Sequence, residues 1–230
     1  MKTKISLIIA LVLSAFYSQA QKKSDPGETS FGLRGGVNFQ NINGKNADGN
    51  DLSNDLLTGF NVGVNAEIPI APQFYFQPGL LFSTKGAKNN NFVVLGQTIE
   101  RTLKISYLEL PLNFVFKPML GTGHMLLGFG PYAALGVGGK AKYVVGGVSS
   151  TEDIDFKNTV SDADPKNVVY FRPFDAGANL LAGYEFSNHI SFQLNAQLGL
   201  AKINSKYENS PNDKTSAKNT GFGVSLGYRF

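Results

Sequence analysis

The sequence contains no cysteine among its 230 residues. Small exported domains that lack a large core are often held together by disulfides, and this chain cannot belong to that class. The sequence also lacks, after its first residues, any apolar run approaching the roughly 18 residues of a transmembrane helix. The fold must therefore be stable without covalent cross-links and without a membrane-spanning helix.

The N-terminus has the pattern of a secretory signal peptide. Lys2 and Lys4 precede a short apolar run at residues 5–16, and small residues occupy the two positions that signal peptidase reads, Ser18 and Ala20. The run is too short to span a bilayer as a helix. We therefore expect cleavage after Ala20 and export of the mature chain from the cytoplasm.

Charge gives no sign of a nucleic-acid partner. The chain has 21 basic and 17 acidic residues, and loss of Lys2 and Lys4 with the leader leaves 19 against 17, a net charge of +2. No block of basic residues interrupts this balance. Glycine, with 26 residues, and phenylalanine, with 18, are abundant instead, and they fall on opposite faces of the pattern described next.

Eight stretches alternate with the period of two that is typical of β-strands. Their apolar faces begin at Phe31, Phe60, Phe74, Leu108, Met125, Phe174, Ile190 and Phe222. The opposite faces carry mainly Gly, Asn, Gln and Ser. Upstream of Tyr107 the apolar residues change parity, at Ile99, Leu103 and Ile105, so we expect a β-bulge there.

The connections between these stretches alternate in length. Three are short, at residues 69–72, 118–123 and 187–189. Four are long and polar, at residues 41–56, 85–98, 141–169 and 202–218. Short periplasmic turns and long extracellular loops are typical of bacterial outer-membrane barrels. We predict an all-β fold, an eight-stranded antiparallel up-and-down transmembrane β-barrel.

The domain organisation follows from this assignment. A signal peptide covers residues 1–20, a periplasmic N-terminal segment covers 21–30, and the outer-membrane β-barrel domain covers 31–230. The even strand count that such a barrel requires is met by eight strands.

A soluble barrel or sandwich is the main alternative, because it alternates equally well with its apolar face inward. Two features favour the membrane. The polar face lacks the Lys, Glu and Thr of a water-facing strand, and its small and amide residues fit the crowded lumen of an eight-stranded barrel. The other face carries Phe and Leu on every strand, as lipid contact and interfacial girdles require.

The C-terminal stretch GFGVSLGYRF, residues 221–230, contains a G-x-S-x-G match around Ser225. A nucleophile elbow needs a strand, a sharp turn and then a helix. Alternation runs unbroken through Ser225, and the chain ends five residues later. We therefore predict that Ser225 points into the lumen of the last strand and is not a nucleophile.

Several of these stretches resemble the recurring strands of the PorT-type outer-membrane β-barrel family of Bacteroidetes-like Gram-negative bacteria. The similar segments are FGLRGGVNFQNI (31–42), YLELPLNFVFKP (107–118), GFGPYAALGVGGK (128–140), FDAGANLLAGYEF (174–186) and ISFQLNAQLGLAKI (190–203). The resemblance implies an outer-membrane barrel without a catalytic motif, and its name-giving member is implied in type IX secretion. It also implies that Tyr228 and Phe230 form the C-terminal signal that the barrel assembly machinery reads.

The inward face of the predicted barrel carries six charged residues. They are Arg34, Glu67, Glu109, Asp175, Glu185 and Arg229. Charges in a low-dielectric lumen must be paired. We expect all except Glu109 and Asp175 to lie near the periplasmic end, in an ionic network that fills the lumen. A narrow pore gated by the same charges is the alternative.

Other candidate sites are weak. His124 and His189 fall in predicted periplasmic turns, away from any outward Ser/Asp pair, so we assign no catalytic residue and expect no enzyme. Lys140 follows two glycines, but Ala141 stands where a phosphate-binding loop needs Ser or Thr. We therefore expect no cofactor.

The acidic loops raise the question of calcium. The segment NADGNDLSND, residues 46–55, offers oxygens at Asn46, Asp48 and Asn50 but lacks the Gly and the closing Glu of an EF-hand loop. We expect ordinary solvated loops here and in the other acidic segments, 151–156 and 161–165, and we predict no metal site.

These patterns predict an integral protein of the Gram-negative outer membrane that presents extracellular loops for adhesion, partner binding or envelope integrity. Loops carry function on rigid scaffolds, so a protein partner should bind through residues 41–56, 85–98, 141–169 and 202–218. Outer-membrane lipid, lipopolysaccharide and the barrel assembly machinery are the other expected partners. The alternatives are a PorT-like accessory role in a secretion or transport assembly and a narrow pore.

Overall fold

The computed structural model describes residues 27–94, 97–210 and 212–230. The predicted signal peptide and its cleavage site lie outside these residues. Eight long antiparallel strands dominate the fold. They are β1 (Ser30–Lys45), β2 (Leu57–Ala71), β3 (Phe74–Val94), β4 (Gln97–Phe116), β6 (Gly123–Val145), β10 (Phe174–Glu185), β11 (Ile190–Gly199) and β13 (Ser216–Arg229).

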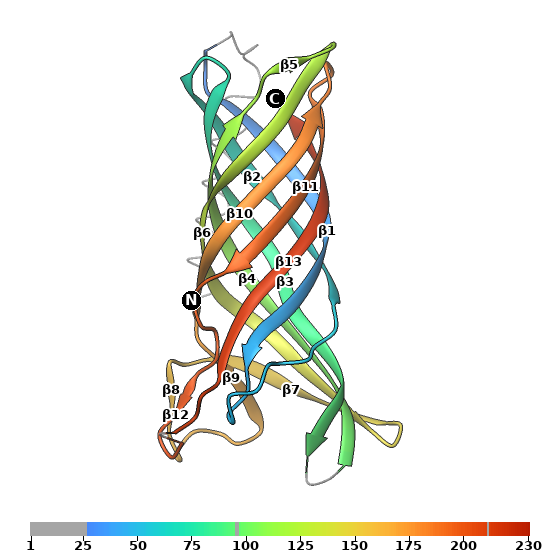
Figure 1. Cartoon of the computed structure of the whole chain (residues 1–230), viewed down its shortest axis with the longest axis vertical. Coiled ribbons are helices and arrows are strands. Elements are labelled where there is room, and N and C mark those ends of the chain that lie inside the picture. Colours follow the sequence, from blue (N-terminus) through green and yellow to red (C-terminus); the bar gives the residue numbers. More distant parts are fainter. Residues whose placement is uncertain (1–26, 95–96, 211) are drawn as a thin grey trace, which may run out of the picture.

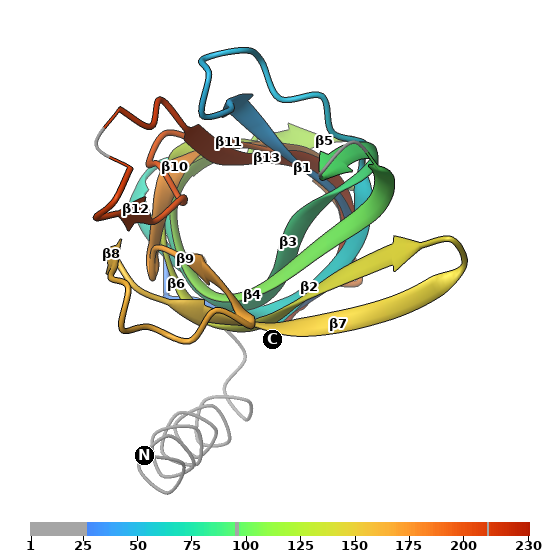
Figure 2. The ribbon, with the colours of Figure 1, turned by 90° about the horizontal axis from the view of Figure 1, so that it is seen from below.

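The eight strands form a closed ring. Each pairs with the next in chain order, and β13 pairs back along β1 from Gly32↔Arg229 to Lys45↔Ser216. The view along the barrel shows this ring (Figure 2). The predicted eight-stranded up-and-down barrel is therefore confirmed.

Five short strands complete the fold. They are β5 (Met119–Leu120), β7 (Val148–Phe156), β8 (Thr159–Val160), β9 (Val168–Phe171) and β12 (Lys206–Tyr207). All but β5 gather at one end, here called the loop end, where β7 pairs with β6 and β9 and where β8 pairs with β12 (Figure 1). The opposite end, the turn end, holds β5, the short turns and the C-terminus. No helix among the described residues is long and apolar enough to cross a membrane.

The apolar side chains of the barrel point outward and the polar ones point inward. Leu33 in β1 and Phe129 in β6 are 51% and 63% exposed, whereas the inward Asn38 and Gln193 are 4% and 3% exposed. The same contrast recurs around the ring. An apolar outer surface of this extent is stable in lipid and not in water. The alternative of a soluble barrel with an apolar core is therefore wrong.

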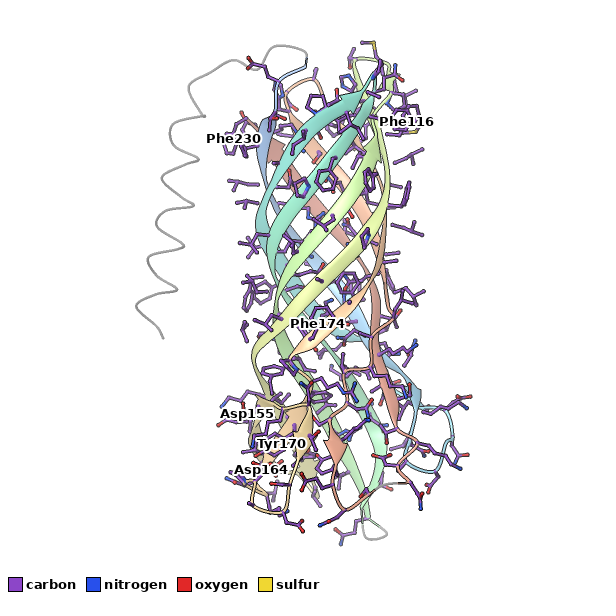
Figure 3. All side chains as sticks on the ribbon, turned by 90° about the vertical axis from the view of Figure 1, so that its left-hand side faces the viewer. Phe116, Asp155, Asp164, Tyr170, Phe174 and Phe230 are labelled. Carbon is purple, nitrogen blue, oxygen red and sulfur yellow. The ribbon has the colours of Figure 1, made fainter. Side chains whose placement is uncertain are left out.

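Aromatic residues mark the two limits of this apolar belt. Phe116 and Phe230 lie at the turn end and Phe174 lies close to the loop end (Figure 3). Neighbouring rings pack on one another, with centroids 4.7 Å apart for Phe74 and Phe116 and 5.4 Å apart for Tyr228 and Phe230. Amphipathic and aromatic girdles at the two interfaces are expected of a membrane barrel.

The long loops are shorter than predicted, because several strands continue beyond the belt. The predicted loop 85–98 is almost wholly strand, since β3 extends to Val94 and β4 begins at Gln97. Residues 41–45 belong to β1, 141–145 to β6 and 216–218 to β13. Backbone pairing between β3, β4, β6 and β7 stabilises this extension. The predicted loop 141–169 therefore includes a β-hairpin that projects from the loop end (Figure 2).

The β-bulge predicted near Tyr107 is present, but its cause differs from the one inferred. The β4–β6 register shifts between Ser106 and Tyr107, with Val137 of β6 as the extra residue. The orientation of β4 does not change there, because Ile105, Tyr107 and Glu109 are all buried. The apolar residues change sides because the lipid belt ends, and beyond it the inward face packs against an apolar core.

Candidate functional site: the barrel lumen

Four charged side chains cross the lumen at the turn end, and we call them the turn-end cluster: Glu67, Lys117, Glu185 and Arg229. Lys117 Nζ lies 2.8 Å from Glu67 Oε1 and 2.8 Å from Glu185 Oε1. Arg229 bridges the same two carboxylates, with Nη2 3.1 Å from Glu67 Oε2 and Nε 3.5 Å from Glu185 Oε2. Two cations and two anions thus alternate in a buried ring.

A second group lies toward the loop end, and we call it the Lys85 cluster: Lys85, Glu109 and Asp175. Lys85 Nζ lies 2.8 Å from Glu109 Oε2 and 3.2 Å from Asp175 Oδ2. Lys85 and Asp175 are completely buried. Buried charges are stable only when they are paired and hydrogen-bonded, and the surrounding side chains supply the remaining bonds.

Tyrosine and amide groups surround the Lys85 cluster. The Tyr132 hydroxyl donates to Asp175 Oδ2 over 3.3 Å, and Asn219 Nδ2 donates to the same oxygen over 3.0 Å. Gln197 Nε2 donates to Glu109 Oε1 over 2.9 Å. Lys85 Nζ also lies 4.2 Å from the centroid of the Tyr132 ring, within reach of a cation–π interaction. The cluster and the groups that surround it come from six strands: β3, β4, β6, β10, β11 and β13.

A polar cavity of about 50 Å³ separates the two clusters, and Arg34, Asn61, Asn195 and Ser225 are among its lining residues. Arg34 Nε has no hydrogen-bond acceptor among the described residues, and the Arg34 charge interacts with Glu109. The Lys85 cluster alone has one cation and two anions, so Arg34 balances its excess negative charge. The two clusters and Arg34 together hold four cations and four anions.

An apolar core closes the lumen at the loop end. Its buried members are Ile42, Ala87, Leu103, Ile105, Tyr107, Tyr132, Ala134, Ala141, Ile154, Phe171, Ile203 and Ala217. They come from the barrel strands β1, β3, β4, β6 and β13, from β7 and β9, and from the connection after β11. The lumen therefore contains, in order from the turn end, an ionic layer, a polar cavity, a second ionic layer and an apolar layer.

The structure brings five of the six predicted lumen charges into the two clusters. Glu67, Glu185 and Arg229 meet at the turn end, and Glu109 and Asp175 belong to the Lys85 cluster. Arg34 does not join them and lies one layer deeper, because its β1 position pairs with Gly227 and Gly63, two residues further along the barrel than Arg229. Two cations were missing from the predicted set. Lys117 has the inward parity of Glu109, and Lys85 was assigned to a loop.

The remaining candidate residues lie in strands and turns. Ser225 is buried within the uninterrupted strand β13 and accepts a hydrogen bond of 3.1 Å from Asn195 Nδ2. His124 is the second residue of β6 and His189 lies in the turn before β11 with a φ of 66°, both at the turn end. Asn46 Oδ1 accepts the backbone N–H groups of Asp48 and Asn50, which makes it a turn-capping side chain.

The predicted C-terminal signal residues lie on the outer surface of the barrel. Tyr228 is 47% exposed and Phe230 is 42% exposed. Phe230 N donates to Phe31 O over 2.9 Å, which attaches the last residue to β1 at the closing seam.

A closed barrel with an apolar outer belt and a polar, charge-paired lumen defines an integral β-barrel protein of the Gram-negative outer membrane. The sequence matches the family model described as "Outer membrane protein beta-barrel domain" over residues 19–205. The chain therefore belongs to this family.

Solved structures with a similar fold share little sequence with it. The attachment invasion locus protein Ail of Yersinia pestis has 16% identity and a TM-score of 0.38, covering 90% of this chain and 100% of Ail. The Neisserial surface protein A has 10% identity and a TM-score of 0.42, covering 88% and 99%. OprG of Pseudomonas aeruginosa has 14% identity and a TM-score of 0.40, covering 89% and 97%. Comparison with curated proteins finds no match.

Proposed function

We propose that this protein is a non-enzymatic outer-membrane barrel whose loop end is an extracellular platform for a binding partner, in adhesion or in envelope integrity. The observation that carries the proposal is the apolar core under the loop end. It holds the extended parts of β3, β4 and β6 beyond the lipid belt. A surface that is ordered before binding loses less entropy when a partner docks, and such rigidity suits a recognition surface.

The lumen argues against the alternative of a narrow pore. The turn-end cluster and the Lys85 cluster each join charges from different strands in direct contact. Ions would have to break both layers and cross the apolar core to pass. The hydrogen bond from Asn195 to Ser225 within the strand wall in turn supports a non-enzymatic role.

A PorT-like accessory role in a secretion or transport assembly is the second candidate function. It is favoured by the resemblance of five strand segments to that family, from residues 31–42 to 190–203. The outward Tyr228 and Phe230 would be read by the barrel assembly machinery, and the apolar belt would contact outer-membrane lipid and lipopolysaccharide. In either role the protein partner binds at the loop end.

The projecting β6–β7 hairpin is a suitable place to test partner binding. Its tip carries Val145 and Val148, which are 41% and 75% exposed. Replacing residues 144–149 with Asn-Gly shortens the hairpin and keeps the Tyr143↔Ser150 pair next to a two-residue turn. Cross-linking and affinity capture from outer membranes should recover a partner with the wild type and lose it with this variant. A Met119→Ser/Leu120→Ser variant at the turn end is the control.

The orientation of the barrel in the outer membrane can be measured with single introduced cysteines, because the sequence itself contains none. A membrane-impermeant maleimide added to intact cells should label Lys166→Cys at the loop end and should not label Ser187→Cys at the turn end. Labelling of Ser187→Cys alone would place the loop end in the periplasm and contradict the proposal.

A further inference from the structure

A polar hollow of about 380 Å³ lies at the loop end, between the start of β10 and the connection from β11 to β13. Three cations line it, Arg172, Lys202 and Lys206, together with the hydroxyl groups of Ser210 and Thr215. Residues 30 or more positions apart in the chain thus bring cations and hydroxyl groups to one hollow.

These cations lack counter-ions. In the described part of the chain, no ion pair within 4.0 Å involves Arg172, Lys202 or Lys206, and Arg172 Nε is buried without a hydrogen-bond acceptor. Some other loop-end lysines have carboxylate partners, such as Lys140 with Asp153. The hollow brings together three cations that form no such pair.

One carboxylate, Asp213, also lines the hollow. Its Oδ1 accepts the backbone N–H of Thr215 over 2.8 Å and also bonds to the Thr215 hydroxyl. Asp213 thus shapes the local turn, and the hollow keeps a net charge of +2 from three cations and one anion.

The hollow adjoins the limit of the lipid belt. Arg172 stands two residues before the outward Phe174, and Lys202 stands two residues after the outward Leu200. Phe174 and Leu200 are 53% and 59% exposed, and their strands β10 and β11 are neighbours that pair up to Gly177↔Gly199. Figure 3 shows Phe174 at the loop-end limit of the barrel. We expect lipid head groups immediately beyond the apolar belt, near these cations.

We propose that Arg172, Lys202 and Lys206 form a binding site for a phosphate group carried by a head group of the outer leaflet. A guanidinium binds phosphate oxygens in a bidentate manner, and the two lysines and the Ser210 hydroxyl can supply further charge-assisted hydrogen bonds. The site rests on the proposed extracellular orientation of the loop end but not on partner binding by the β6–β7 hairpin, so the site and the hairpin platform can each fail alone.

Binding can be measured by microscale thermophoresis on the full-length protein refolded in detergent. The titrants are bisphosphorylated lipid A, the same lipid after dephosphorylation, and inorganic phosphate. We expect lipid A to bind more tightly than its dephosphorylated form. The Arg172→Gln/Lys202→Gln variant should bind lipid A more weakly, by about tenfold for each charge-assisted hydrogen bond lost. An unheated gel lane shows that the variant is folded.

Two further variants make the test specific. Lys140→Gln/Lys166→Gln removes the same charge elsewhere at the loop end and should bind lipid A like the wild type. Asp213→Asn removes the negative charge but keeps the acceptor for Thr215, and should bind lipid A more tightly. Displacement of lipid A by millimolar inorganic phosphate would support a site that also takes free phosphate. Equal binding of the two lipid forms, or equal losses in both double variants, would overturn the site.

Discussion

Lys85 of β3 and Asp175 of β10 come from distant walls of the barrel, and Lys85 Nζ lies 3.2 Å from Asp175 Oδ2. In the ring order, β4 and β6 stand between these two strands on one side and four strands stand between them on the other. The pair therefore spans the lumen and does not merely join neighbours. Because both side chains are completely buried, neither charge can be solvated if the other is removed.

Removing the Lys85 charge should strongly destabilise the barrel. Lys85→Met leaves Glu109 and Asp175 as buried carboxylates without their cation, and breaking a buried ion pair in this way costs about 3–5 kcal/mol of unfolding free energy. Urea titration of the protein refolded in detergent measures this loss. The control is Lys104→Met in β4. The Lys104 side chain is exposed, so this substitution should change the unfolding free energy by only about 0.5 kcal/mol.

The triple variant Lys85→Met/Glu109→Gln/Asp175→Asn distinguishes the effect of unpaired charge on stability from the effect of changed side-chain shape. Neutralising all three side chains removes the unpaired anions, so stability should return toward that of the wild type. If Lys85→Met alone were as stable as Lys104→Met, the ion pairs would not hold the lumen together.

Conductance should stay negligible when only one ionic layer of the lumen is disrupted. Arg34→Ala should not open the lumen, because Arg34 lines the central cavity and belongs to neither layer of contacts. A variant of the turn-end cluster, Lys117→Ala, should also remain closed, because the Lys85 cluster and the apolar core persist. Planar-bilayer recordings measure this. Steady ion current through the wild type or through Arg34→Ala would favour the gated pore.

The strand ring was predictable from the sequence because lipid imposes one rule on every residue of the belt. Outward residues such as Leu33 and Phe129 must be apolar, and inward ones such as Asn38 must fit a narrow polar lumen. The period of two is therefore strict, and strand number and order follow from it. The short turns were predictable for the same reason, since alternation stops at them.

Beyond the belt this rule no longer applies, and the predictions were less accurate there. Lys85 looked like the start of a polar loop because Lys, Asn and Gly follow it. In the structure β3 continues, and its inward Lys85 meets carboxylates from β4 and β10. Such a contact depends on the diameter and stagger of the closed barrel. The alternation pattern of a single strand carries no information about either. Lys117, by contrast, could have been found from its parity.

The seam between β1 and β13 should tolerate a side chain at Gly35 but not at Gly36. A Cβ at Gly36 would lie 2.3 Å from Val224 O and 2.5 Å from Ser225 Oγ, whereas one at Gly35 would lie 3.9 Å from its nearest neighbour, Asn61 O. Overpacking of this kind costs about 1–3 kcal/mol. We expect Gly36→Ala to slow closure of the barrel and lower its urea midpoint, measured by the heat shift on gels.

Gly35→Ala is the matched control, because it adds the same methyl group one residue away on the other face. It should refold and shift on heating as the wild type does. Equal behaviour of the two variants would mean that the strands at this seam are less closely packed than described.

A charged side chain on the outward face of β13 should destabilise the barrel. Val224 faces lipid between Val37 of β1 and Leu194 of β11. An arginine near the bilayer midplane of a barrel costs about 2–4 kcal/mol, so Val224→Arg should lower the unfolding free energy by about that amount in lipid vesicles. Val224→Leu should leave it nearly unchanged. A stable Val224→Arg protein would contradict the assignment of the lipid face.

The ion pair between Lys157 and Asp164 at the loop end should lower the pKa of the Asp164 carboxyl group. The hydrogen bond from Lys157 and then the Ser161 backbone N–H, 2.9 Å from Asp164 Oδ2, lower the pKa of Asp164 below its ordinary value of 3.8. The same contact raises the pKa of Lys157 above 10.5. A carboxyl with a lowered pKa stabilises the fold above its ordinary pKa and loses that effect as pH falls through the folded value. A lysine with a raised pKa stabilises the fold below its ordinary pKa and loses that effect as pH rises through the folded value.

This segment should therefore keep its conformation across neutral pH and loosen below the ordinary pKa of Asp164 or above that of Lys157. In Lys157→Gln the largest cause of the shift is removed, so the pKa of Asp164 should rise toward 3.8 but stay below it, because the Ser161 N–H remains. Carbon-detected NMR titration of the Asp164 carboxyl group in detergent micelles measures this. Lys166→Gln is the control, since Lys166 pairs with Asp162 and should leave the pKa of Asp164 unchanged. An unaltered Asp164 pKa in Lys157→Gln would mean that Lys157 does not contact this carboxylate in solution.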